Sequence, residues 1–253
     1  MKIKKAIIPA GGIGSRLRPL TYAVPKELLP IGSVPIIDYI LQECSLSGME
    51  EIIFVLSDNK SNLFKYLYKT QNIGFKKDLR FCFVPQIPTY GTASAVLSCE
   101  SILKNEDFAV VFPDELYFDD APALLQLCEK YYENGKSVLG TFSVKKENCS
   151  SYGIIKSHRI GNENKVEQII EKPKTDPPSL NALSGRFILK NDVFPYLRKI
   201  EKNNNEYYLT DALSLYIKEH VLLEQPIIGK RFDCGQKEGY LNVIKSPYID
   251  ICE

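Results

Sequence analysis

The 253-residue sequence has almost no net charge, no long apolar run and no regularly spaced pair of cysteines. Its 32 Lys and Arg residues against 31 Asp and Glu residues leave a formal charge of +1, so the chain as a whole exerts no general attraction on nucleic acid or on an anionic membrane. No apolar stretch approaches the ~18 residues that a membrane-spanning helix requires. Any anion-binding site must therefore come from a local cluster of charges.

The seven cysteines are scattered, are odd in number and never occur as C-x-x-C, which argues against a disulfide framework and against a zinc site. Most of them lie in apolar runs, as is typical of small core residues in a reducing compartment. The sequence starts Met-Lys-Ile-Lys-Lys, with no pattern of a signal peptide. We therefore expect a cytoplasmic protein with neither nucleic acid nor membrane among its partners. The two histidines, His158 and His220, are far apart and form no Ser-His-Asp or Cys-His set.

Apolar runs and helical patterns alternate through the first half of the chain. Strands are predicted near 6–8, 52–56, 81–84, 108–112 and 138–144, and helices near 36–44, 63–67, 93–103 and 121–132. This order predicts an α/β fold with a Rossmann-like, mostly parallel central sheet and helices on both faces.

After about residue 150 the pattern changes to strands joined by polar turns. Strands are predicted at 152–156, 165–171 and 183–189, short helices at 192–200 and 210–220, a last strand opening at Ile227-Ile228, and a closing helix from Gln236. No Gly/Ser-rich linker separates the halves. We therefore expect a single domain, residues 1–253, whose second half adds an antiparallel layer.

A glycine-rich segment, residues 10–19, follows the first predicted strand. Its glycines allow the backbone to approach a ligand closely and to turn N–H groups toward an anion. A dinucleotide-binding loop would need a glycine in place of Leu17 and a helix that continues through Pro19. A P-loop would need Gly-Lys-Ser/Thr where Gly14 begins Gly-Ser-Arg. Two interpretations of the segment remain. It is either a phosphate-binding loop supported by arginine or a plain turn with solvated arginines.

The next segment favours the phosphate-binding alternative. Lys26 stands between Pro25 and Pro30, and the proline before it restricts the local backbone, so its side chain is aimed rather than free. With Arg16 and Arg18 it forms a dense positive set, which suits a polyphosphate.

Residues 11–21 (GGIGSRLRPLT) followed by residues 25–30 (PKELLP) resemble the signature of the sugar-1-phosphate nucleotidylyltransferases. The glutamate after Lys26 and the segment 233–240 (DCGQKEGY) are most similar to the bacterial UTP–glucose-1-phosphate uridylyltransferases. The resemblance extends in order over nearly the whole chain. It implies the nucleotide-diphospho-sugar transferase fold, in which residues 1–150 form a nucleotide-binding half and residues 151–253 form a sugar-phosphate-binding half with C-terminal helices.

Two aspartates each follow a predicted strand. An aspartate such as Asp114, at the carboxyl end of a buried parallel strand, points into the ligand crevice of an α/β sheet, although for a lone aspartate an Asx turn is the more common interpretation. Two carboxylates together with phosphate oxygens suit Mg²⁺, and the resemblance implies that Asp114 and Asp233 hold this ion. The neighbouring Glu115, Asp119 and Asp120 are expected to be solvated or to cap turns.

The resemblance also assigns roles to the other candidate residues, which without it would be a surface glutamine, ordinary strand glycines and an exposed ion pair. It implies catalytic roles for Arg16, Lys26 and Lys172, nucleotide binding by Ala10, Gly11, Gly12, Gly14, Gln86 and Gly91, and sugar-phosphate binding by Gly153, Glu171, Lys172 and Gly185. The amide of Gln86 would read the base, since it offers both a donor and an acceptor.

The reaction that the resemblance implies joins UTP and glucose 1-phosphate into UDP-glucose with release of pyrophosphate, by Mg²⁺-assisted in-line attack on the α-phosphate. The partners are then small molecules, a nucleoside triphosphate and a sugar 1-phosphate. Two alternatives stay open: an enzyme that uses dTTP or another nucleotide, and a non-catalytic regulator that binds nucleotide sugars. The oligomeric state is also open, with a homo-oligomer among the options.

Overall fold

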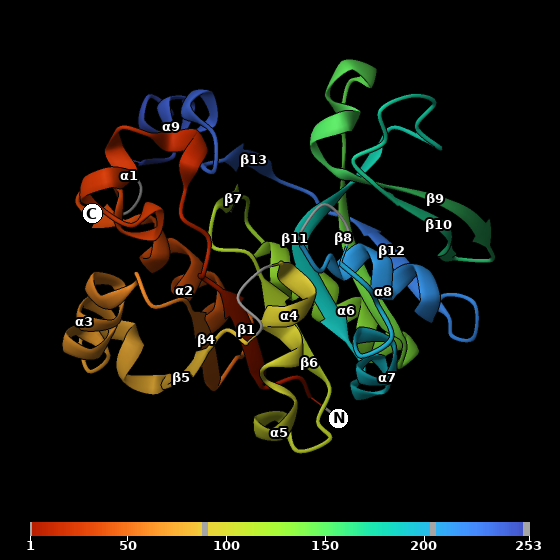
Figure 1. The fold of residues 1–253 in the computed structure, drawn as a ribbon, viewed down its shortest axis with the longest axis horizontal. Coiled ribbons are helices and arrows are strands. Elements are labelled where there is room, and N and C mark those ends of the chain that lie inside the picture. Colours follow the sequence, from red (N-terminus) through yellow and green to blue (C-terminus); the bar gives the residue numbers. More distant parts are fainter. Residues whose placement is uncertain (1, 88–90, 203–205, 250–253) are drawn as a thin grey trace.

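The computed structural model describes residues 2–87, 91–202 and 206–249, and a nine-stranded sheet runs through them (Figure 1). Its strands lie in the order β5 (Arg80–Pro85), β4 (Glu51–Leu56), β1 (Lys5–Pro9), β6 (Phe108–Val111), β11 (Asn181–Leu189), β8 (Ser137–Ser143), β12 (Leu222–Pro226), β10 (Glu163–Glu171) and β9 (Gly153–Ile160). The first four are parallel, β11 is antiparallel to β6 and β8, and β10 is antiparallel to β12 and β9.

Apolar side chains cover both faces of the sheet. Successive residues of a strand point to opposite faces, so in β1 Ile8 joins one buried cluster and Ile7 the other. Helices α2 (Ile36–Leu46), α3 (Ser61–Thr70) and α6 (Ala123–Asn134) pack on the Ile8 side, and α4 (Thr92–Leu97), α5 (Glu100–Leu103), α7 (Phe194–Leu197) and α8 (Leu209–Tyr216) pack on the Ile7 side. In Figure 1, α4 and α8 lie in front of the sheet and α6 lies behind it.

Short elements complete the end of the sheet where the parallel strands finish. They are α1 (Leu20–Ala23), the hairpin of β2 (Pro30–Ile31) and β3 (Val34–Pro35), α9 (Lys237–Ile244), and 3-10 turns at Ser15–Leu17, Lys26–Leu28 and Lys146–Ser151. Two further 3-10 turns, at Gly74–Asp78 and Asn191–Val193, lie at the other end of the sheet, before β5 and after β11. A separate two-stranded sheet pairs β7 (Glu115–Phe118) with β13 (Lys230–Asp233), and Glu115 lies opposite Asp233. This small sheet returns the C-terminal part of the chain to the end of β6.

The predicted fold class is confirmed, and four details differ. The antiparallel strands are hydrogen-bonded into the same sheet rather than forming a separate layer. The helix predicted over 93–103 is two helices, α4 and α5. The strand predicted to open at Ile227-Ile228 is wrong, because these residues link β12 to β13 and Ile228 is exposed. Strand β7 was not predicted.

The interpretation of the cysteines as core residues agrees with the described part of the chain. Five of them are buried and one is half-buried, all as free thiols: Cys44, Cys99, Cys128, Cys149 and Cys234, and Cys82. Cys252 lies outside the described residues. Burial raises the pKa of Cys99 and of Cys128 to about 12, which keeps both thiols protonated. Within the described ranges, no helix has the length and apolar character needed to cross a bilayer.

Candidate active site

The glycine-rich loop leaves the carboxyl end of β1 in a defined conformation. Ala10 is buried, and its backbone N–H donates to the Val55 carbonyl at 2.9 Å. Gly14 has a φ of +68°, in the left-handed region, and a Cβ there would lie 2.9 Å from the side chain of Thr21. The Thr21 hydroxyl in turn donates to the Gly14 carbonyl at 2.8 Å. Gly11 to Gly14 therefore form a closed turn at the edge of the sheet where ligands of α/β folds bind.

Lys26 reaches from its own 3-10 turn to this loop and to Asp114. Its ammonium lies 2.5 Å from Asp114 Oδ2, and it is 3.8 Å from the position that a Cβ on Gly12 would occupy. Burial alone would lower the pKa of Lys26, but the charges of Asp114 and Glu27 outweigh it and raise this pKa above its ordinary value. Burial likewise acts to raise the pKa of Asp114, and Lys26 and Arg16 outweigh it and hold this pKa low. Both groups are therefore charged at neutral pH.

The small β7–β13 sheet brings the second aspartate beside the first. Its register sets Asp233 opposite Glu115, and the Cys234 N–H donates to the Asp114 carbonyl at 2.8 Å. A Cβ built on Gly235 would lie 2.8 Å from Asp114 Oδ2, 3.1 Å from Asp233 Oδ1 and 3.4 Å from Arg16 Nη2. Four of the predicted residues, Arg16, Lys26, Asp114 and Asp233, thus converge on one small region.

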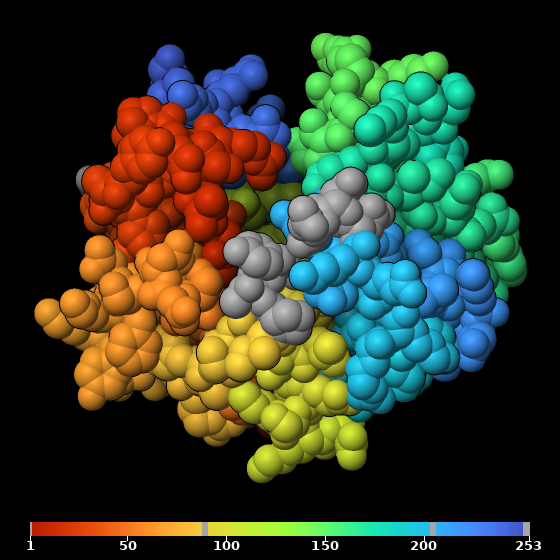
Figure 2. Space-filling view, in the orientation of Figure 1, coloured from red at the N-terminus to blue at the C-terminus, as the bar shows by residue number. Residues whose placement is uncertain are grey.

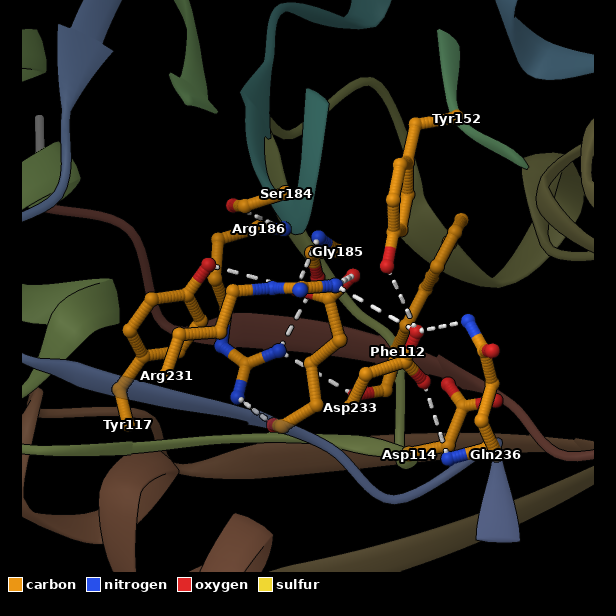
Figure 3. Close-up of polar contacts among 12 residues, drawn as sticks. Phe112, Asp114, Tyr117, Tyr152, Ser184, Gly185, Arg186, Arg231, Asp233 and Gln236 are labelled. Carbon is orange, nitrogen blue, oxygen red and sulfur yellow. Dashed lines mark hydrogen bonds and ion pairs between the residues drawn. The ribbon is translucent and has the colours of Figure 1, made fainter. Parts of the chain in front are cut away.

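Asp233 is held by groups that sequence reasoning did not single out (Figure 3). The Tyr152 hydroxyl donates to its Oδ2 at 3.0 Å, the Gln236 amide donates to the same oxygen at 2.8 Å, and the Gly235 N–H donates to its Oδ1 at 3.1 Å. Tyr152 is the residue before β9, and Gln236 is the residue before α9. Asp233 therefore connects the chain just before β9 with the chain just before α9.

Two carboxylates close together fit a divalent cation that prefers oxygen ligands. No group of three or more His, Cys, Asp or Glu side chains within the described ranges could hold a metal by itself. Mg²⁺ is commonly bound by one or two carboxylates together with substrate phosphates and water, which matches the pair formed by Asp114 and Asp233. The donor set thus suits an ion that arrives with a nucleotide.

Gln86 and Gly91 form a second group beside the glycine-rich loop. The Gln86 side chain is buried, and its amide donates to the Gly91 carbonyl and to the Ser94 hydroxyl, both at 2.8 Å. Its Oε1 lies 2.2 Å from where a Cβ on Gly11 would stand, so a larger residue there would displace the Gln86 amide. Gly91 has a φ of +99°, and a Cβ there would lie 2.2 Å from the carbonyl oxygen of Tyr207. The residues predicted to bind the nucleoside are therefore neighbours, and the prediction that Gln86 reads the base stays a prediction.

The residues predicted to bind sugar phosphate gather on the other side of Asp233. Glu171 Oε1 lies 3.2 Å from the ammonium of Lys172, and its Oε2 accepts a hydrogen bond of 2.9 Å from Thr210. A Cβ on Gly153 would lie 3.3 Å from Glu171 Oε2. The Lys172 N–H donates to the carbonyl of Tyr152 at 3.1 Å, which ties this group to the tyrosine that holds Asp233.

Glu115 is not solvated, contrary to the prediction. It accepts two hydrogen bonds from Arg231, of 2.9 and 3.1 Å, and one from the Gly185 N–H at 3.2 Å. A Cβ on Gly185 would lie 2.5 Å from Phe112 Cβ, so glycine is required where β11 passes the end of β6. Arg231 also lies over the ring of Phe142, 3.7 Å from its centroid. Glu115 therefore links the segment of Asp114 to Gly185 and to the strand of Asp233.

The space-filling view shows a hollow at the centre of one face of the molecule (Figure 2). The N-terminal segment, drawn in red, bounds it on one side, and green segments from the start of the second half bound it on the other. The nucleotide-side and sugar-side groups come from these two parts of the chain. Arg18, by contrast, is exposed and stacks over Tyr22, with 4.8 Å between its guanidinium carbon and the ring centroid.

Gly235→Ala is expected to lower turnover by a factor of about 10² while leaving thermal unfolding nearly unchanged, because its methyl group would enter the region between the two carboxylates. Gly235 has no left-handed φ and keeps its N–H bond to Asp233, so the fold tolerates alanine. The check is the initial rate of the expected pyrophosphate release, measured beside the control Lys237→Ala at an exposed position. Equal rates for the two variants would refute the placement of ligand at Gly235.

Comparison with known proteins gives a consistent set of relatives. The nucleotidyl transferase family matches residues 5–247. The UTP–glucose-1-phosphate uridylyltransferase of Staphylococcus epidermidis is 36% identical over 260 residues, with 95% of this chain and 90% of that protein covered. A solved UDP-glucose pyrophosphorylase complexed with UDP-glucose is 33% identical, has a TM-score of 0.90, and covers 98% of this chain and 99% of its own. A UTP-bound enzyme of the same name from Acinetobacter baumannii is 26% identical, with a TM-score of 0.81 and 98% and 96% of the two chains covered.

Proposed function

Because the chain belongs to the nucleotidyl transferase family, we propose that it makes UDP-glucose and pyrophosphate from UTP and glucose 1-phosphate. The observation that carries this proposal is the convergence of Lys26, Asp114, Asp233 and Arg16 on one region beside the glycine-rich loop. Relatives of nearly equal length bear the name of this activity, which favours UTP and glucose 1-phosphate over other pairs.

In the proposed reaction, an oxygen of the sugar phosphate attacks the α-phosphorus of the nucleotide and pyrophosphate leaves from the opposite side. The nucleophile is already an anion, so the protein contributes positioning and charge stabilisation rather than a covalent intermediate. The backbone of Ala10, Gly11, Gly12 and Gly14 holds the nucleotide. Arg16 and Lys26 balance the charge of the triphosphate and of the departing pyrophosphate.

The sugar side supplies the second reactant. Lys172 orients the attacking phosphate, Glu171 accepts hydroxyl groups of the sugar, and Gly153 and Gly185 line the sugar pocket. Gln86 and Gly91 hold the base. This assignment keeps the expected division of the chain, with the nucleotide bound by residues 1–150 and the sugar phosphate by residues 151–253.

Asp114 and Asp233 are the residues that would hold Mg²⁺. The ion, when bound, withdraws charge from the phosphate that is attacked. In this structure the ammonium of Lys26 pairs with Asp114. Lys26 would be able to turn to the phosphates if a cation replaced it on the carboxylate.

A regulator that only binds nucleotide sugars has no need for Arg16, Lys26, Asp114, Lys172 and Asp233 together. Calorimetric binding measured beside pyrophosphate release separates this alternative from the enzyme, because a regulator would bind without turnover. The cytoplasmic location expected from the sequence remains part of the proposal.

The direct test is a pyrophosphate-release screen of UTP, dTTP, ATP, CTP and GTP against a panel of sugar 1-phosphates in the presence of Mg²⁺. We expect the highest kcat/KM for UTP with glucose 1-phosphate, and loss of activity when the metal is chelated. No release from any combination would end the proposal, and a preference for dTTP would replace UTP in it.

A further inference from the structure

A charged pair is buried beside the turn that carries Lys26. Glu27 is 0% exposed, and the side chain of Lys60, the residue before α3, is 3% exposed. The Lys60 ammonium donates to both carboxylate oxygens of Glu27, at 2.7 and 3.0 Å. Removing two charges from water is costly, and a buried ion pair is often no more stable than an apolar pair of the same volume. Stability alone therefore does not explain why this pair is present.

The turn that presents Lys60 also holds the glycine-rich loop. Residues 57–60 follow β4, and the Lys60 N–H donates to the Ser57 carbonyl at 3.0 Å. The Ser57 hydroxyl donates to the carbonyl of Gly11 at 2.8 Å. One short turn thus contacts the glycine-rich loop through Ser57 and the Lys26 segment through Lys60.

The Lys26 segment has little regular backbone structure, although Leu28 and Leu29 pack against the core. It is a single 3-10 turn, closed by hydrogen bonds from the N–H groups of Leu28 and Leu29 to the carbonyls of Pro25 and Lys26. Adjacent side chains leave this turn in different directions, Glu27 toward Lys60 and Lys26 toward Asp114. Anchoring Glu27 therefore sets the direction of Lys26.

We propose that the Glu27–Lys60 ion pair is a positioning device for the nucleotide, which holds Lys26 and the Gly11–Gly14 loop at a fixed separation so that both contact the same triphosphate. This inference rests on the proposed function and extends it to two residues that touch no reacting atom. Glu27 and Lys60 are positioning residues, and their effect is specific to the nucleotide rather than to the sugar phosphate.

The test uses the double variant Glu27→Gln/Lys60→Met, which removes both charges and leaves no unpaired ion in the interior. We expect its unfolding midpoint to stay near that of the unaltered protein. We expect KM for UTP to rise about tenfold and kcat/KM for UTP to fall by up to about 10²-fold, because a small displacement of a binding group is costly. KM for glucose 1-phosphate is expected to be unchanged, and calorimetry with UTP alone is expected to show the same loss of affinity.

A matched control is the pair formed by Asp38 and Lys76. It is also buried, with the Lys76 ammonium 2.7 Å from Asp38 Oδ2, and it holds neither the glycine-rich loop nor Lys26. Asp38→Asn/Lys76→Met is expected to leave both KM values unchanged. If the first double variant does not fold, Glu27→Gln/Lys60→Gln removes both charges and keeps two side chains that can hydrogen-bond to each other, and a loss of UTP affinity in the same direction is expected.

Unchanged UTP affinity in the Glu27 variants would overturn the positioning role. An equal change in both KM values would do so as well, because it would indicate a general structural loss. A protein that binds UTP without releasing pyrophosphate would instead refute the proposed function, and the calorimetric comparison would still decide the role of the pair.

Discussion

Asp114→Asn is expected to lower kcat by a factor of about 10² to 10³, comparable to the loss of one preorganised charge-stabilising group in an active site. Asparagine keeps the shape of the side chain and an oxygen that can accept from Lys26. It removes the negative charge that faces Lys26 at 2.5 Å and lies beside Asp233 across Gly235. The site would then have one carboxylate in place of two, and an unbalanced lysine.

The measurement is the initial rate of pyrophosphate release at saturating nucleotide, together with thermal unfolding followed by circular dichroism. Asp120→Asn serves as the control, because Asp120 is exposed and lies beyond the end of β7. We expect the control to retain full activity. If Asp114→Asn turned over as fast as the control, Asp114 would have no part in holding a metal or in balancing Lys26.

Arg186→Met is expected to destabilise the fold by about 3–5 kcal/mol, the cost typical of leaving one member of a buried ion pair without its partner. Arg186 is 0% exposed and makes five hydrogen bonds. Two go to the carboxylate of Glu43 in α2, at 2.8 and 2.7 Å, and three go to the carbonyls of Phe112, Gly185 and Glu115. All five N–H groups of the guanidinium are therefore used.

These bonds connect α2 and β11 to the segment that carries Asp114 (Figure 3). The chain has no tryptophan, so urea denaturation followed by tyrosine fluorescence or by circular dichroism measures the loss of stability. The double variant Glu43→Gln/Arg186→Met is expected to regain part of the stability, because no charge is then left alone in the interior. Arg198→Met is the control, since Arg198 pairs with Glu100 at the exposed surface. If Arg186→Met were as stable as Arg198→Met, the hydrogen bonds of Arg186 would contribute nothing to the stability of the fold.

Local patterns in the sequence predicted the segments on which the site is built. The apolar run of β1 followed by glycines, the restricted Lys26 and the aspartate after β6 are features of neighbouring residues, and each lies where it was expected. Apolar runs and turn residues act over a few positions, so they can be recognised without the rest of the chain.

The partners of the site residues were not predictable in the same way. Glu115 was expected to be solvated, yet it is bound by Arg231, more than a hundred positions later in the chain. One signal was present: Arg231 and Asp233 are two positions apart and would share a face of any strand. The last strand was predicted to open too early, at Ile227-Ile228, because Lys230–Asp233 contains a single apolar residue, Phe232, and periodicity cannot be detected in so short a polar run.

The pair formed by Glu27 and Lys60 illustrates the same limit. In the sequence, Glu27 only marks similarity to one group of enzymes and Lys60 is one lysine among many. Their burial becomes visible only when the turn after β4 packs against the turn of Lys26.

The amino-acid sequence by itself determined the α/β class, most of the strands and helices, and the position of the glycine-rich loop, because hydrophobic periodicity and backbone restriction are local properties. The tertiary structure alone decided which charges meet. Asp114 and Asp233 become neighbours through the register of β7 and β13, and Tyr152 reaches Asp233 from the residue before β9. Coulomb interactions and hydrogen bonds depend on distance in space, which separation along the chain does not reveal.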